Sequence, residues 1–198
     1  MIDFAVEVVK KYTINSNCVR AAVIRYNNSA DVLIQLDSYS DVNQLVFTIF
    51  GIKYVGGSSN LSAALDLLRT RVFASNIVRP NTAQICVIVT DRLHPSSQLD
   101  TAASRVRSQG ITILAVGVTG PGRVNTDVMY SIASNRWAIA VSDYGQLISG
   151  ARNIIVQQYG CFAFTTTSRT TTTLQSQFPS PSKYSLGESL CSITWQFE

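Results

Sequence analysis

The chain has 198 residues, of which 46% are hydrophobic and only 14% charged, whereas typical soluble domains carry about 25% charged residues. This composition excludes a wholly disordered chain, and the length fits one domain with an appendage. The formal charge is +4, but the basic residues are scattered and do not gather with aromatic residues, which argues against a nucleic-acid-binding protein. No apolar run approaches the ~18 residues that a membrane-spanning helix needs, so we expect no membrane insertion.

Histidine and cysteine usage narrows the possible chemistry. His94 is the only histidine, which excludes His-rich zinc sites and most histidine-dependent nucleophilic triads. The four cysteines, Cys18, Cys86, Cys161 and Cys191, show no Cys-x-x-Cys spacing, and the sequence does not choose among their three possible pairings. Cys86 lies within an apolar run, so we expect it to be a buried free thiol.

The first half of the chain alternates between helical and strand patterns. An apolar stripe predicts a helix over residues 3–12. The turn-forming Asn27-Asn28-Ser29 separates strands predicted at 19–26 and 31–36, which together indicate a hairpin. Asp41 is placed to cap a helix over 41–50, and after the glycine-rich segment 56–60 a longer helix is expected over 61–73.

The second half contains the two most informative strands. Residues 85–89 and 111–118 are continuously apolar and rich in β-branched side chains, which is typical of strands buried on both faces of a parallel sheet. A polar-faced helix over 98–108, ended by Gly110, fits the crossover between them. A helix over 125–133, a strand over 137–141 and a helix over 144–159 follow, so the sequence predicts an open α/β sheet with helices on both faces.

The composition changes after Cys161. Seven of the nine residues from Thr165 to Thr173 are threonine, and Pro179 and Pro181 follow among serines, so residues 161–189 are expected to be a linker. Both an O-glycosylated stalk and a plain flexible linker fit this composition. Residues 190–198 alternate apolar and polar side chains, which fits either the start of another module or the end of a broken gene model.

Candidate site residues follow the buried strands, since ligands of open α/β sheets bind at the carboxyl ends of the strands. Asp91 ends the strand over 85–89, and Ser59 lies in the loop before the helix over 61–73. A carboxylate with hydroxyl oxygens suits Mg²⁺. An alternative is a nucleotide or phosphate hydrolase that uses the loop Gly56-Gly57-Ser58-Ser59, although this loop lacks the lysine and spacing of a P-loop.

Three segments together resemble a von Willebrand factor type A domain: 54–65 (YVGGSSNLSAAL), 87–91 (VIVTD) and 110–118 (GITILAVGV). The start of the last helix, 141–147, is similar too. The resemblance covers residues 1–160. It implies a doubly wound, mostly parallel sheet with one antiparallel edge strand and helices on both faces.

The resemblance also implies a metal-ion-dependent adhesion site. Ser59 stands at the family's threonine position and Asp91 at its later aspartate, so these two residues are the candidate Mg²⁺ ligands. Arg92 replaces a common glycine, and its cation would oppose Mg²⁺ binding if the side chain pointed into the site. The family's first central strand and its Asp-x-Ser-x-Ser loop have no counterpart before residue 3. We therefore expect an incomplete site, two unpaired strand edges, and a fragment whose signal peptide lay upstream. Residues 190–197 could fill the gap, but their one-sided alternation favours a half-exposed strand over a central one.

The function implied by the resemblance is a non-enzymatic, extracellular adhesion module that binds matrix proteins, collagen-like ligands among them, through Mg²⁺. Ser58, Arg92 and His94 are candidate ligand contacts, although His94 also fits an ordinary exposed loop residue. A metal-independent interaction domain or structural spacer of the same fold is the alternative. Asn27-Asn28-Ser29 fits the N-glycosylation pattern, which makes Asn27 a candidate glycan site in a secreted protein.

Overall fold

The structure is a computed structural model that describes residues 1–74, 76, 78–119, 123–151 and 191–197. Six strands form one sheet in the order β2-β1-β6-β3-β4-β5. β1 and β2 form an antiparallel hairpin at one edge, and all other neighbouring strands are parallel. This arrangement is the predicted α/β fold with one antiparallel edge strand.

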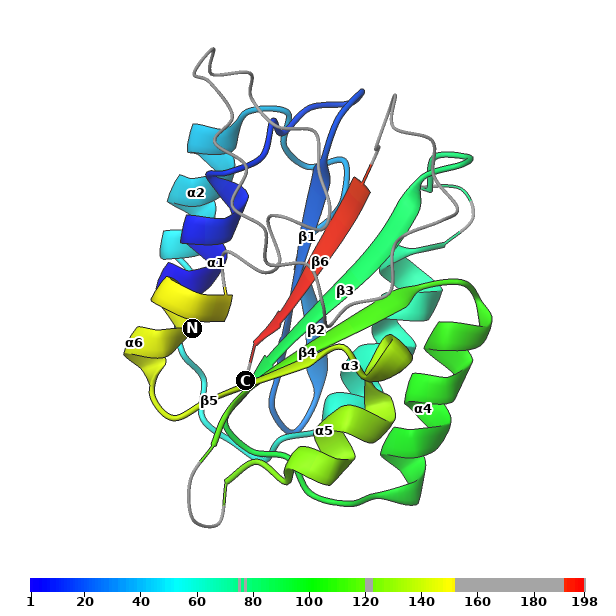
Figure 1. The fold of residues 1–198 in the computed structure, drawn as a ribbon. Helices are drawn as coiled ribbons and strands as arrows, with labels where there is room; N and C mark the ends of the chain where they lie inside the picture. Colours follow the sequence, from blue (N-terminus) through cyan, green and yellow to red (C-terminus); the bar gives the residue numbers. More distant parts are fainter. Residues whose placement is uncertain (75, 77, 120–122, 152–190, 198) are drawn as a thin grey trace, which may run out of the picture.

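The helices cover both faces of the sheet (Figure 1): α1, α2 and α6 lie on one face, and α3, α4 and α5 on the other. The strands are β1 (Arg20–Tyr26), β2 (Ala30–Ile34), β3 (Ala83–Thr90), β4 (Thr112–Val118), β5 (Ala138–Val141) and β6 (Cys191–Phe197). The α-helices are α1 (Ile2–Val9), α2 (Val42–Phe50), α3 (Leu61–Leu67), α4 (Ser97–Ser108), α5 (Thr126–Ile132) and α6 (Tyr144–Gln146). Short π-helical segments, Leu68–Val72 and Leu147–Ala151, extend α3 and α6.

Strand alternation divides the core into two layers. In β3, Ile85, Val87 and Val89 pack with α1 and α2, whereas Cys86 and Ile88 pack with α3, α4 and α5. Each of these side chains is at most 1% exposed. Because successive side chains of a strand point to opposite faces, a strand covered on both faces has to be apolar throughout, as the sequence predicted.

The central position that the family's first strand would occupy is filled from the other end of the sequence, because β6 lies between β1 and β3 and is parallel to both (Figure 1). As expected, no strand precedes α1 in the described residues. Thr194 is in register with Ala22 on one side and Cys86 on the other. Residues 191–197 therefore pair within this sheet. The physical reason is that β1 and β3 otherwise present unpaired backbone groups, and an extended segment between them satisfies both edges at once. The expected unpaired edges do not occur here.

Local signals placed the helix boundaries well. The Asp41 carboxylate accepts hydrogen bonds from the backbone N–H groups of Asn43 and Gln44 at the start of α2, and Gly110 follows α4 with a left-handed φ of 81°. The helix expected over 144–159 is described only to residue 151, and the linker expected over 161–189 lies outside the described residues.

Cysteine chemistry and hydropathy add two facts. Cys86 is a buried free thiol, as expected, and burial raises its pKa. Cys18 is disulfide-bonded. Within the described residues, no helix combines the length and apolar character needed to cross a membrane.

Candidate functional site

The segment from Lys53 to Asn60 crosses the carboxyl end of the sheet and is held against the β1–β2 turn. Asn28 Oδ1 accepts hydrogen bonds from both the backbone N–H and the hydroxyl of Ser58, each at 2.7 Å. The backbone N–H of Asn60 donates to the Asn27 carbonyl at 2.8 Å. Hydrogen bonds between the turn and the facing loop fix the path of the loop. We call this carboxyl edge of the sheet, with the segment from Lys53 to Asn60 and the loop after β3, the rim.

Gly57 is required where this segment approaches the turn most closely. Its φ is +149°, and a Cβ added there would lie 3.0 Å from Asn28 Oδ1 and 3.1 Å from Asn27 Cβ. A residue with a side chain therefore meets both backbone strain and a steric conflict at this position. The local backbone geometry therefore requires glycine at position 57, independently of the family resemblance.

Ser59 and the loop after β3 meet at this edge. The Ser59 hydroxyl lies 3.5 Å from the Arg92 carbonyl, which also accepts a 2.7 Å hydrogen bond from the hydroxyl of the fully buried Thr90. Ser59 lines a small cavity of about 170 Å³ together with His94. Asp91 instead lines a larger neighbouring cavity, and Arg92 borders both.

Asp91 is engaged by two groups that the sequence did not indicate. The Tyr144 hydroxyl donates a 2.7 Å hydrogen bond to Asp91 Oδ2, and the Arg123 guanidinium lies 3.7 Å from the same oxygen. Burial, and then the hydrogen bond to Asp91, raises the pKa of Tyr144. Asp143 caps α6, the short helix that begins at Tyr144. Its own pKa is lowered by the hydrogen bond from the Gln146 N–H.

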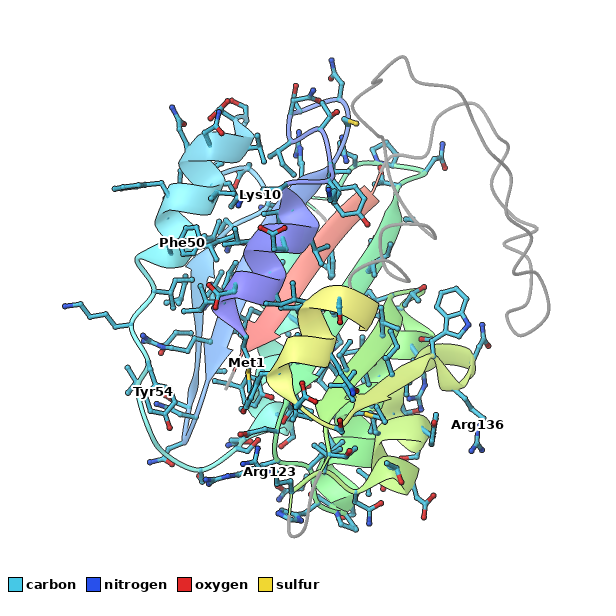
Figure 2. The ribbon with its side chains drawn as sticks, turned by 60° about the vertical axis from the view of Figure 1, so that its left-hand side comes forward. Met1, Lys10, Phe50, Tyr54, Arg123 and Arg136 are labelled. Carbon is cyan, nitrogen blue, oxygen red and sulfur yellow. The ribbon has the colours of Figure 1, made fainter. Side chains whose placement is uncertain are left out.

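The larger cavity has a volume of about 370 Å³. Its lining comes from the start of α1, the end of β1, the segment after α2, the loop after β3 and the start of α6. Tyr54, Val55 and Tyr144 are 80%, 44% and 42% exposed around it. Figure 2 shows Tyr54 and Arg123 at this carboxyl end and Lys10 toward the opposite end.

The described residues do not fit a divalent cation as they are arranged here. Asp91 Oδ2 already faces the Arg123 cation and a Tyr144 hydroxyl proton, and a metal ion at this oxygen would have to displace both. Among the described residues, no group of three or more His, Cys, Asp or Glu side chains could hold a metal. Ser59 and Asp91 alone would supply only two protein oxygens, and the two residues line different cavities.

The other predicted residues have identifiable positions. Ser58 is exposed but donates its hydroxyl to Asn28, so it fastens the rim. Arg92 and His94 are exposed at the rim. Asn27 is half-buried, and its amide nitrogen lies 3.4 Å from the Gly56 carbonyl. Its use as a glycan site stays a prediction.

The loop Gly56-Gly57-Ser58-Ser59-Asn60 is a poor phosphate cradle in this conformation. The backbone N–H groups of Ser58 and Asn60 already donate to Asn28 and Asn27, and a phosphate site needs such donors free. Sequence reasoning missed Lys53, Tyr54, Arg123 and Tyr144. Their positions in the sequence could have indicated them, because all four follow helices or strands that end at this edge of the sheet.

Comparisons with known proteins agree with this architecture. The family model of the von Willebrand factor type A domain matches residues 1–153. The human collagen alpha-5(VI) chain is 29% identical over 140 residues, which cover 69% of this chain and 5% of the collagen chain. The human collagen alpha-1(XX) chain is 25% identical over 150 residues, covering 73% of this chain and 11% of the relative. The chain thus spans a small part of the length of these relatives.

Solved structures share the fold. Proximal thread matrix protein 1 from the mussel byssus superimposes with a TM-score of 0.70 at 20% identity, covering 79% of this chain and 39% of that chain, and it has also been solved with zinc in its MIDAS motif. Manganese-loaded TRAP protein of Plasmodium vivax has a TM-score of 0.62 at 16% identity, covering 75% of this chain and 62% of its own. Because the family model covers most of the chain and the sheet has the corresponding architecture, the chain belongs to the von Willebrand factor type A domain family.

Proposed function

We propose that this domain is a non-enzymatic protein-binding module of an extracellular matrix protein, and that it binds its partner without a metal ion. Support comes from its relationship to von Willebrand factor type A modules of collagen VI and collagen XX chains. The extracellular location is part of the same proposal, because it derives from those relatives.

One observation carries the metal-independent form of the proposal: Asp91 Oδ2 is engaged by Tyr144 and Arg123. An ion pair and a hydrogen bond already occupy this oxygen, so a hydrated cation would have to compete with both for it. The exposed Tyr54, Val55 and Tyr144 border the same rim. Tyrosines at a rim are typical of protein interfaces, where one end of the side chain is apolar and the other polar.

The second candidate is the Mg²⁺-dependent adhesion module implied by the family resemblance. Ser59 and Asp91 would be its ligands from this chain, and a metal ion at Asp91 Oδ2 would have to displace Arg123 and Tyr144. The metal-occupied structures of the mussel and Plasmodium proteins favour this candidate at the level of the fold. The two candidates differ in their response to chelation.

Binding to a panel of immobilised matrix proteins, collagens among them, tests the proposal. We expect the purified chain to bind at least one of them with the same affinity in Mg²⁺ and in EDTA. Binding that disappears in EDTA would establish the Mg²⁺-dependent candidate. Binding to none of the panel by a folded chain would overturn the protein-binding proposal itself.

A further inference from the structure

The cavity at the carboxyl edge combines apolar and charged groups in a way that specifies a ligand. Ile2 and Ile52 are half-buried in it, and Tyr54, Val55 and Tyr144 are exposed around it. It is open to solvent, and its volume of about 370 Å³ suits one or two side chains of a partner.

Some of the charged side chains that line the cavity have no ion-pair partner among the described residues. Asp91 is paired with Arg123, and Arg25 is paired with Asp31 at 3.4 Å while also lying 3.5 Å from the Lys53 carbonyl. Lys53 and Arg92 are exposed, and neither has an ion-pair partner in the part of the chain that the structure describes. Asp3, at the start of α1, is the other acid in the lining. Two cations are therefore available to a ligand.

We propose that this cavity binds an acidic segment of the partner protein, with a carboxylate side chain at Lys53 and Arg92 and an adjacent apolar side chain against Tyr54 and Val55. This inference rests on the proposed function and names the chemistry of its partner. The two cations supply the positive charge that attracts a carboxylate. Charge-assisted hydrogen bonds from arginine and lysine to carboxylates are strong enough for that task.

A protein ligand fits this site better than a sulfated polysaccharide does. A polysaccharide would meet Lys53 and Arg92 but would leave the exposed Tyr54 and Val55 without an apolar partner. The Asp3 and Asp91 carboxylates also interrupt the basic surface, whereas a polyanionic chain needs a continuous one. An acidic side chain beside an apolar one matches both kinds of group.

The test uses the full chain and two fluorescent peptides, Ala-Glu-Leu-Glu-Leu-Ala and its neutral counterpart Ala-Gln-Leu-Gln-Leu-Ala, in EDTA. We expect saturable binding of the acidic peptide. The neutral peptide should bind at least about tenfold more weakly, because the loss of one well-formed charged hydrogen bond raises the dissociation constant by about that factor. Lys53→Gln and Arg92→Gln should each weaken binding of the acidic peptide several-fold, and Tyr54→Ser should weaken binding of both peptides.

Lys11→Gln is the matched control, because Lys11 is an exposed lysine just beyond the far end of α1. It should leave binding unchanged, and thermal unfolding of every variant should match the wild type, because all three cavity side chains are exposed. Reversing both charges, with Lys53→Glu and Arg92→Glu together, should abolish binding of the acidic peptide.

Three results would overturn the inference: equal binding of the two peptides, unchanged binding by Lys53→Gln and Arg92→Gln, or heparin competing as well as the acidic peptide with no dependence on Tyr54. If the panel of matrix proteins still binds while the cavity variants behave as wild type, the inference fails and the proposed function stands. If the panel does not bind either, the proposed function fails with it.

Discussion

The hydrogen bond between Tyr144 and Asp91 links the free energy of unfolding of the domain to the protonation of the Tyr144 hydroxyl. Burial and this hydrogen bond raise the Tyr144 pKa above its ordinary value of 10.0. The folded state therefore holds the phenolic proton more tightly than the unfolded chain does. The stabilisation is fully present below the unfolded pKa, and it is lost as the pH rises through the folded pKa.

We expect Tyr144→Phe to lower the free energy of unfolding at neutral pH, and its difference from wild type to shrink as the pH rises above about 10. Urea unfolding at neutral and alkaline pH measures this difference. Tyr54→Phe, the same change at a side chain that is 80% exposed, is the control. A difference between wild type and Tyr144→Phe that does not vary with pH would contradict the role assigned to the phenolic proton.

At the scale of elements, the path of the segment from Lys53 to Asn60 depends on Gly57. Gly57→Ala should lower the free energy of unfolding by about 1 to 3 kcal/mol, the usual range for a residue forced into a conformation that favours glycine. Gly56→Ala is a matched control, since its added Cβ would meet nothing closer than Tyr54 Oη at 3.7 Å. Equal melting temperatures for the two variants would show that the rim tolerates a side chain at Gly57.

Elements whose signal is local could be predicted from the sequence. Each such signal reflects only the conformation of its own segment. The apolar runs of β3 and β4, the Asp41 cap and the glycine after α4 were all predicted correctly on this basis. The position of β6 was not predicted, because the one-sided alternation along residues 191–197 favours a half-exposed strand, whereas β6 is paired on both edges in the middle of the sheet. For the same reason Asp91 was found and Arg123 and Tyr144 were not: their meeting depends on how three separate loops pack.

At the scale of the whole molecule, the sheet is continuous only because β6 joins the β2–β1 hairpin to β3, β4 and β5. Thr194→Pro removes the backbone N–H in the middle of β6, where both neighbours are paired, and proline is not accommodated in central strands. We expect a loss of at least about 1 to 3 kcal/mol of stability from the unsatisfied ladder group.

Thermal unfolding measures the effect of Thr194→Pro, and Thr194→Val, which keeps the N–H, is the control. Amide hydrogen exchange adds a local readout, because opening the β6 position should speed exchange in β1 and β3. If Thr194→Pro and Thr194→Val melt together and the amides of β1 and β3 exchange at wild-type rates, residues 191–197 do not form the central strand.

The central claim is that Arg123 and Tyr144 close Asp91 to metal ions, and a Mg²⁺ titration followed by the backbone amide resonances of Ser59, Asp91 and Arg92 tests it most directly. The account predicts no saturable shift of these resonances in the wild-type chain at millimolar Mg²⁺. Saturable shifts confined to Ser59 and Asp91 in the wild-type chain would contradict it.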